Sequence, residues 1–468
     1  NYCQNDARIT YNLTGFNNDL LMNLLIVISR IARMPIDDIS RMGVSQWIRS
    51  LLYYEHRQNG ILIPRRQELD NRSSDVSNDA IIKDKKFRGG LVVEPQVGIH
   101  FDVTVMDFAS LYPSIIKVKN LSYETVRCSH DECKKNTIPQ TNHWVCTKKN
   151  GLTSVLIGSL RDLRVNYYKN MAKKDTLTAE ERQLFTVVSQ ALKVILNASY
   201  GVMGAEIFPL YFLPAAEATT ATGRHIILST INKCKESGID VLYGDTDSLF
   251  VKKPTPKQIE DIITRAKIDH NVELEIDKEY RYVVLSSRKK NYLGVRKNGK
   301  VDVKGLTGKK SHTPPFIKTL FYELLDILSE IKTIEEFERA KNKISDKISE
   351  CARKVQAKEI PLQDMAFKVM LSKALNEYTK TIPQHIRAAK QLESIREIKK
   401  GDIISYVKIL NKPGVKPIEM ARKSEIDSSK YMEFMESMLD QLTSSMDLDF
   451  DTILGKPKQT GLEQFFWN

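Results

Sequence analysis

The chain has 468 residues, of which 41% are hydrophobic and 28% charged, and its formal net charge is +13. This composition is typical of a globular protein with material for about three domains. The positive charge favours a polyanionic partner such as nucleic acid or an anionic membrane, with a generic basic surface as the simpler alternative.

No apolar stretch reaches the roughly 18 residues of a membrane span, and the longest, around 20–32, contains Asn23 and Arg30. Six cysteines in a chain of this length exclude a secreted disulfide scaffold. We therefore expect a soluble, cytoplasmic protein with no membrane partner. Because its first residue is Asn1 and not Met, we also expect the chain to begin partway through a longer protein.

Hydrophobic spacing predicts helices in most of the chain, over 15–60, 154–174, 179–203 and 215–237, and mainly helices beyond Pro315. The second and third of these segments predict a helical hairpin, with Thr178 as the N-cap of its second helix.

Strands are predicted over 89–95, 101–108, on both sides of Asp245, near 280–304 and over 401–410. The polar stretch 66–86 predicts a loop.

Two carboxylates, Asp245 and Asp247, interrupt the apolar stretch VLYGDTDSLF (241–250). Gly and Asp are ordinary turn residues, so a polar hairpin tip explains them simply. A cation site is the alternative, because like charges this close repel unless a cation neutralises them, and hard divalent cations take oxygen ligands.

A third carboxylate, Asp107, ends a predicted strand in MDFASLYPSII (106–116). If both strands lie in one sheet, Asp107 converges with Asp245 and Asp247. Such a cluster suits two Mg²⁺ ions that clamp an in-line phosphoryl displacement.

In QALKVILNASYGVMG (190–204), Lys193, Asn197 and Tyr200 share one face of the predicted helix. The stripe suits a nucleotide, with Lys193 on a phosphate and Tyr200 near a base. A solvated face with a packed tyrosine is the simpler alternative.

In this order, DFASLYPSII, KVILNASYG and YGDTDS resemble the three polymerase motifs of family B DNA polymerases of the archaeal replicative type. Further stretches, FRGGLVVEP (87–95), AAEATTATGR (215–224), KKNY (289–292) and GDIISYV (401–407), resemble other parts of that family. The match covers nearly the whole chain.

The resemblance implies an α+β fold, a right-hand polymerase with an antiparallel-sheet palm, a two-helix fingers hairpin and a mainly helical thumb. The implied domains are an exonuclease remnant with linker helices at 1–60, palm at 61–152 and 205–310, fingers at 153–204, thumb at 311–455, and a clamp-binding tail at 456–468.

The resemblance also implies a template-directed DNA polymerase that uses dNTPs, primer–template DNA and two Mg²⁺ ions. Asp107, Asp245 and Asp247 would be catalytic, and Asp107, Asp247 and the carbonyl of Phe108 would bind the metal. The implied dNTP-binding residues are Ser110, Leu111, Tyr112, Arg164, Lys193 and Asn197. The implied DNA-binding residues are Tyr200, Tyr243, Lys289, Lys290, Tyr292, Lys304, Lys309 and Lys310. Tyr112 would reject a ribose through its 2′-OH.

Three residues depart from the family pattern: Ala198 stands for a usual Ser, Tyr168, beside Lys169, for a usual basic residue, and Phe87 for a usual Tyr. None removes a catalytic group, but Tyr168 leaves the set of triphosphate contacts open.

At the N-terminus, Tyr2 and Asp6 resemble the last of three motifs of the family's proofreading 3′–5′ exonuclease. Because one Asp cannot build a two-metal site, we expect the exonuclease site to be incomplete in this chain. A coincidental helix start is the alternative.

At the C-terminus, QTGLEQFF (459–466) resembles the peptide with which replication proteins bind a sliding clamp. Leu462, Phe465 and Phe466 would form a hydrophobic plug, with Gln459 as a polar anchor. A tail folded back onto its own domain is the alternative.

Three cysteines and a histidine, Cys128, Cys133, His143 and Cys146, supply the ligands of a structural zinc site. Similar polymerases from heat-loving archaea carry a disulfide in this neighbourhood, so a Cys133–Cys146 disulfide is a second interpretation and free thiols are a third.

Two rival functions compete with DNA synthesis as interpretations of the sequence. A non-catalytic DNA-binding scaffold has no reason to keep three acids such as Asp107, Asp245 and Asp247. An RNA-templated polymerase usually has paired aspartates at the turn, whereas here Thr246 separates them.

Overall fold

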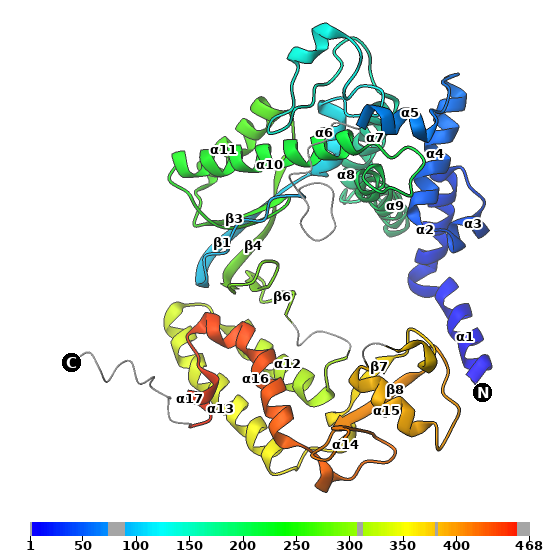
Figure 1. The fold of residues 1–468 in the computed structure, drawn as a ribbon. Coiled ribbons are helices and arrows are strands. Elements are labelled where there is room, and N and C mark those ends of the chain that lie inside the picture. Colours follow the sequence, from blue (N-terminus) through cyan, green and yellow to red (C-terminus); the bar gives the residue numbers. More distant parts are fainter. Residues whose placement is uncertain (1, 74–88, 307–311, 380–381, 456–468) are drawn as a thin grey trace, which may run out of the picture. The chain divides into compact units, whose positions relative to one another are not determined.

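The structure is a computed structural model that describes residues 2–73, 89–306, 312–379 and 382–455 (Figure 1). The chain divides into two compact units. Unit 1 comprises the chain up to Val92 with Met106–Leu249 and Thr255–Ile276, and unit 2 comprises Val93–Val105, Phe250–Pro254 and the chain from Asp277 onward.

Helices make up most of unit 1. They are α1 (Tyr2–Thr14), α2 (Phe16–Ala32), α3 (Ile36–Arg41), α4 (Val44–Gln58), α5 (Arg66–Ser73), α6 (Leu111–Val118), α7 (Leu152–Asp162), α8 (Lys169–Met171), α9 (Ala179–Met203), α10 (Leu213–Glu236) and α11 (Pro256–His270), with a 3-10 turn η1 (Asp131–Lys135) and a π-helical turn η2 (Leu163–Tyr168).

Six strands form one sheet in the order β2-β3-β1-β4-β5-β6. Their bounds are β1 (Gly98–Phe108), β2 (Asp240–Asp245), β3 (Ser248–Lys252), β4 (Leu274–Leu285), β5 (Tyr292–Arg296) and β6 (Val301–Lys304). The pairs β4–β5 and β5–β6 are antiparallel. Strands are therefore present at 101–108, around Asp245 and near 280–304, as the sequence predicts.

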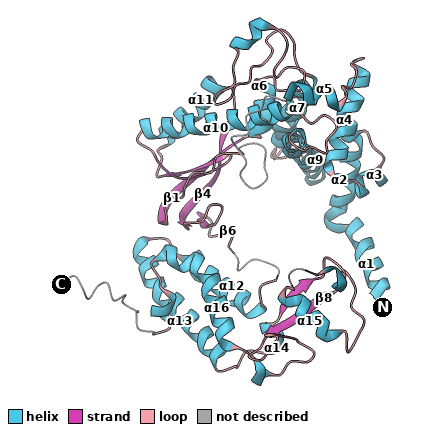
Figure 2. Ribbon diagram, viewed as in Figure 1, coloured by secondary structure: helices cyan, strands magenta, loops and turns pink. Residues whose placement is uncertain are grey.

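The remaining elements of unit 2 are mainly helical, as expected beyond Pro315 (Figure 2). They are α12 (Pro315–Glu330), α13 (Ile334–Gln356), α14 (Leu362–Met365), β7 (Phe367–Met370), η4 (Leu375–Glu377), α15 (Gln384–Leu392), β8 (Ile403–Lys408), β9 (Val415–Pro417), η5 (Lys423–Glu425), α16 (Ser428–Thr443), η6 (Ser444–Met446) and α17 (Phe450–Ile453). The strands β7, β8 and β9 form an antiparallel sheet.

The second helix of the predicted hairpin, α9, begins with the predicted cap. The hydroxyl of Thr178 accepts the amide of Glu181 at 3.2 Å, and the Glu181 carboxylate accepts the amide of Thr178 at 2.8 Å. This reciprocal pair satisfies two amides that a helix start otherwise leaves without acceptors.

Two sequence predictions were wrong in detail. Residues 66–73 form helix α5 rather than a loop, because Arg66 binds Asp70 one turn on and the carbonyls of Glu206 and Phe208. The segment 89–95 makes one isolated bridge, Val92 to Asp245, rather than a strand.

The first helix of the predicted hairpin is present as α7, η2 and α8, which follow one another with helical backbone angles at both junctions and include one π-helical turn. Helix α11 was not predicted; the hydroxyl of Thr255 caps it. No helix in the described part of the chain is both long and apolar enough to cross a membrane.

Unit 2 has one main hydrophobic core. Leu320 and Leu324 of α12, Ile344 and Ile348 of α13 and Met435 of α16 are at most 3% exposed and belong to it. The four-residue spacing within α12 and within α13 places these side chains on one face of each helix.

We expect Ile344→Ala to lower the free energy of unfolding by about 3 kcal/mol, because it removes buried methyl groups and leaves a cavity. The control is Ile334→Ala in the same helix, whose side chain is 59% exposed; we expect it to change stability by less than about 0.5 kcal/mol. Urea titration followed by circular dichroism measures both, and equal effects would contradict this packing.

Candidate functional site

The turn that carries two of the predicted catalytic carboxylates is Asp245–Thr246–Asp247, between β2 and β3. Thr246 has a φ of 60°, which is uncommon for a β-branched residue. Its amide donates to the carbonyl of Leu91 at 2.9 Å. The amide of Asp247 donates to the carbonyl of Asp245 at 2.6 Å. Backbone hydrogen bonds thus hold the turn against the extended segment around Leu91.

The third carboxylate, Asp107, lies near the end of β1. The amide of its neighbour Phe108 donates to the carbonyl of Asp247 at 2.8 Å. Asp107 and Asp245 are half-buried, and Asp247 is exposed. The strand end and the turn therefore lie side by side, although 138 positions separate Asp107 from Asp245.

Helix α6 starts directly after this strand end. Ser110 precedes it with a φ of 53°, and Leu111 is its first residue. The amides of a first helical turn lack acceptors within the helix, and the positive end of the helix dipole attracts anions. The start of α6 can therefore bind a phosphate group beside Asp107.

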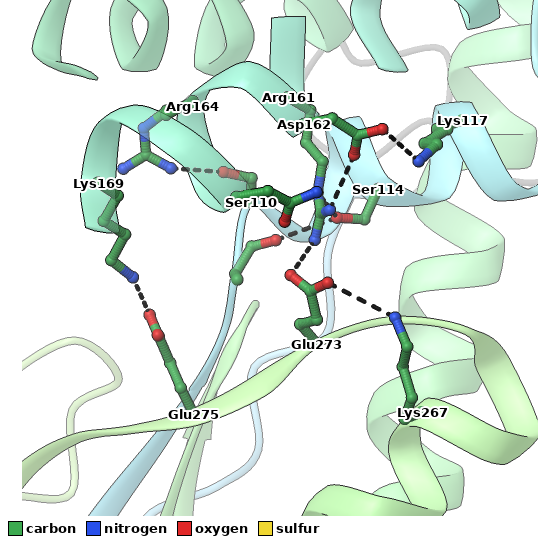
Figure 3. A network of polar contacts seen from close by, with 12 residues as sticks. Ser110, Ser114, Lys117, Arg161, Asp162, Arg164, Lys169, Lys267, Glu273 and Glu275 are labelled. Atoms are coloured by element: carbon green, nitrogen blue, oxygen red, sulfur yellow. Dashed lines mark hydrogen bonds and ion pairs between the residues drawn. The ribbon is translucent and has the colours of Figure 1, made fainter. Parts of the chain in front are cut away.

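Arginines from the α7–η2 region hold this helix start in place (Figure 3). In η2, Arg164 donates through Nη1 to the Ser110 hydroxyl at 2.7 Å. The buried Arg161 donates through Nε to the Ser114 hydroxyl at 3.0 Å and pairs through Nη2 with Glu273. Pairing satisfies a guanidinium that would be costly to bury alone.

Further ion pairs extend the network (Figure 3): Lys117 with Asp162 at 2.5 Å, Lys267 with Glu273 at 3.5 Å, and Lys169 with Glu275. The pKa of Asp162 lies below its usual value, because hydrogen bonds from Lys117 and Arg161 outweigh the burial that would raise it. Lys169, next to the departure at Tyr168, is thus engaged with Glu275.

On α9, the predicted stripe is present. Lys193 and Asn197 are exposed, and Tyr200 is half-buried. The rings of Tyr200 and Tyr112 lie 4.6 Å apart at 44°. Burial, together with the charge of Asp247, raises the pKa of Tyr112 to about 12, so its hydroxyl stays neutral at physiological pH.

Several residues of the site were not singled out in the sequence. Buried Arg224 donates to the carbonyl of Gly89 at 3.0 Å and to the side chain of Gln140 at 3.4 Å. Glu273 and Glu275 receive the cations of the hairpin. The sequence carries no signal for Glu273 and Glu275, because their partners, Arg161 and Lys169, are distant in the sequence.

Some predicted DNA-binding residues lie in unit 2. Lys289 pairs with Glu94 at 2.6 Å. Lys290 lies against Gly305, where a Cβ would meet the Lys290 carbonyl oxygen at 2.2 Å and where φ is 69°. The close approach therefore requires a glycine at 305.

Tyr292 of β5 pairs with Lys304 of β6. Tyr243, in contrast, is only 1% exposed, so its side chain is packed in the core rather than on a DNA-accessible surface. Lys309 and Lys310 lie outside the described residues.

The exonuclease motif expected at the N-terminus and the clamp-binding peptide expected at the C-terminus stay predictions. Asp6 is exposed on α1, of which Tyr2 is the first residue. The residues outside the described range also include Phe87, Gln459, Leu462, Phe465 and Phe466.

The cysteine-rich loop differs from expectation in its histidine. Cys128, Cys133 and Cys146 are free thiols packed together, and no Cys133–Cys146 disulfide is formed. His143 lies apart from them, because its Nε2 binds Glu217 at 2.8 Å and its Nδ1 accepts from Arg127. His130 joins the three cysteines instead.

Comparison with known proteins identifies relatives along nearly all of the chain. The family model of DNA polymerase family B matches residues 34–452. DNA polymerase 1 of Saccharolobus solfataricus is 44% identical over 452 residues, which cover 96% of this chain and 51% of that protein. DNA polymerase 1 of Aeropyrum pernix is 43% identical over 460 residues, covering 98% of this chain and 48% of that protein.

A solved structure, the family B DNA polymerase of the hyperthermophilic archaeon Pyrobaculum calidifontis, matches with a TM-score of 0.68 and 25% identity, over 94% of this chain and 54% of that one. The chain thus spans about half the length of the relatives it matches. The family model, the relatives and the fold agree: the chain belongs to DNA polymerase family B.

Proposed function

We propose that this chain is the polymerase portion of a template-directed DNA polymerase, which transfers a nucleotide from a dNTP to a primer 3′-OH. One observation carries the proposal: the Phe108–Asp247 hydrogen bond apposes the strand end that bears Asp107 to the turn that bears Asp245. Relatives named DNA polymerase 1 support it.

Asp107, Asp247 and the carbonyl of Phe108 are the groups we propose for holding two Mg²⁺ ions, and Asp245 would assist them. They fit, because they offer compact oxygen donors at a partly exposed turn, the kind that Mg²⁺ prefers. When bound, the ions lower the pKa of the attacking hydroxyl and neutralise charge on the phosphates.

The remaining groups bind and orient the nucleotide. The amides of Ser110 and Leu111 receive the triphosphate, and Arg164, Lys193 and Asn197 hold it from the helical hairpin. The primer oxygen forms a bond to the α-phosphorus, the bond to the β-phosphate breaks, and pyrophosphate leaves. Such a transfer depends on positioning and charge neutralisation more than on covalent help.

In this proposal the α7–α9 hairpin is the fingers, the segments around the six-stranded sheet are the palm, and the helices beyond Pro315 are the thumb. Lys289, Lys290, Tyr292 and Lys304 would follow the DNA backbone, and the tail would bind a sliding clamp. The net charge of +13 supports a polyanionic partner, and we expect DNA binding to weaken steeply with salt.

We expect Asp247→Ala to abolish primer extension by the purified chain with Mg²⁺ and dNTPs, because it removes a proposed metal ligand. Asp240→Ala is the control: Asp240 is an exposed acid at the start of β2, and its loss should leave the rate within about twofold. A 3′-mismatched primer should stay untrimmed. If the parent chain binds DNA but extends no primer, the result would instead support a non-catalytic DNA-binding scaffold.

A prediction for nucleotide selection comes from Gly90. A Cβ there would meet the Tyr112 hydroxyl at 2.7 Å and Thr246 Cγ2 at 2.8 Å. The bare backbone at this position thus touches both the proposed ribose-excluding tyrosine and the carboxylate turn.

We expect Gly90→Ala to lower kcat/KM for dNTPs by about 10- to 100-fold, because displacing Tyr112 or the turn misplaces the reacting groups. Gly89→Ala is the matched control, since a Cβ there meets nothing within 4 Å. Steady-state incorporation of a single dNTP measures both variants, and equal activity of the two would rule out this positioning.

The exposed stripe of α9 gives a third test. We expect Lys193→Ala to raise KM for dNTPs by about tenfold, the loss of one charge-assisted contact to a phosphate. Lys173→Ala, an exposed lysine between the two helices of the hairpin, controls for the loss of one positive charge. An unchanged KM in Lys193→Ala would remove this lysine from the triphosphate site.

A further inference from the structure

The segment between α6 and α7 brings together four side chains that the polymerase reaction does not use. The ligand atoms of Cys128, His130, Cys133 and Cys146 all lie within 4.8 Å of one another. The cysteines are at most 4% exposed, and His130 is half-buried.

Backbone contacts fix this arrangement. The amide of Cys146 donates to the carbonyl of Thr125 at 2.9 Å, and Val126 and Val145 form an antiparallel bridge. Trp144 packs against the cysteines, and its indole donates to the carbonyl of Cys128 at 2.9 Å. The two halves of the segment, 128–133 and 146, are thereby held face to face.

We propose that these four side chains bind one Zn²⁺ ion as a structural Cys₃His site. Three thiolates and an imidazole are a common ligand set of structural zinc, and soft sulfur ligands select it over Mg²⁺. The spacing, C-x-H-x₂-C followed by a cysteine 13 residues later, draws all four from one segment.

The distances favour a single ion. Two thiolates bound to one tetrahedral Zn²⁺ at about 2.3 Å lie about 3.8 Å apart. No two of the four ligand atoms lie more than 4.8 Å apart, which is close to this value. The ligands of an iron–sulfur cluster are divided between two or more iron atoms, so those bound to different irons must lie further apart.

Outer contacts are also those of a metal site. The amide of Thr147 donates to the sulfur of Cys133 at 3.4 Å, and its hydroxyl lies 3.5 Å from the same atom. Such hydrogen bonds orient a thiolate ligand and share its charge. A disulfide between Cys133 and Cys146 would not explain why Cys128 and His130 also lie close to these two sulfur atoms.

The site would stabilise the segment that reaches the polymerase centre. Gln140, between the two halves, accepts from Arg224, and Arg224 also holds the carbonyl of Gly89. The side chain of His143, in the same segment, binds Glu217 of α10. Zinc would thus hold this segment in its fold, at a site separate from the proposed Mg²⁺ site.

The test is the zinc content of the full chain, purified without added metal and measured by mass spectrometry of the elements. We expect about one zinc per chain, lost in Cys133→Ser and Cys146→Ser. Cys351→Ser, a half-buried thiol in α13, and His143→Gln should retain it. Loss in His143→Gln with retention in His130→Ala would overturn the ligand set.

Cobalt gives a second readout that does not depend on a variant folding. After removal of zinc, the parent chain with Co²⁺ alone should show the visible bands of a tetrahedral ion and thiolate-to-cobalt charge transfer. Reduced thiols with neither zinc nor a cobalt spectrum, stoichiometric iron, or a Cys133–Cys146 disulfide in peptide mapping would each refute the proposal. None of these results depends on polymerase activity.

Discussion

Mutual repulsion of carboxylates is the constraint on which the site depends. Asp107, Asp245 and Asp247 lie on two neighbouring backbone segments, and like charges that are brought together repel more strongly as the surroundings become less polar. Backbone bonds oppose this: Phe108 to Asp247, and Thr246 to Leu91. The positive φ of Thr246 is a local cost that these bonds sustain. The turn is therefore held by backbone groups, the amides of Phe108 and Thr246 and the carbonyls of Asp247 and Leu91, whereas the proposed metal ligands are the carboxylates of Asp107 and Asp247 and the carbonyl of Phe108.

The same separation between holding and acting groups recurs in the helical hairpin. Arg161 is buried, paired with Glu273 and bonded to Ser114, so it fixes α7 to α6, whereas Arg164, bonded to Ser110, also belongs to the proposed triphosphate site. Lys193 and Asn197 remain exposed on α9. A π-helical turn at η2 is a common feature of functional sites, because the extra residue redirects side chains. Here the π-helical turn contains Arg164, whose side chain bonds the Ser110 hydroxyl.

Small contacts between distant segments complete the site. Gly90 lets the backbone approach Tyr112 and Thr246, and Arg224 anchors Gly89 beside it. Arg224 also contacts Gln140, in the segment that carries the cysteines. The proposed zinc site and the proposed polymerase centre are thus linked through the buried Arg224, which gives the segment that carries the cysteines a structural part in that centre.

The sequence by itself determined the features that arise from neighbours along the chain. Period-2 and period-3.6 patterns located β1, α9 and α10, Thr178 marked a helix start, and the motifs around Asp107 and Asp247 identified the family. The tertiary structure alone decided which distant groups meet. Arg161 and Glu273 are 112 residues apart, and His143 finds Glu217 at 74 residues, which leaves His130 for the cysteines. The burial of Tyr243 and the helix at 66–73 also follow from packing. Local propensity is weak, and contacts between distant residues override it. Two residues of the same type, such as His130 and His143, can therefore be given different roles only once their neighbours in space are known.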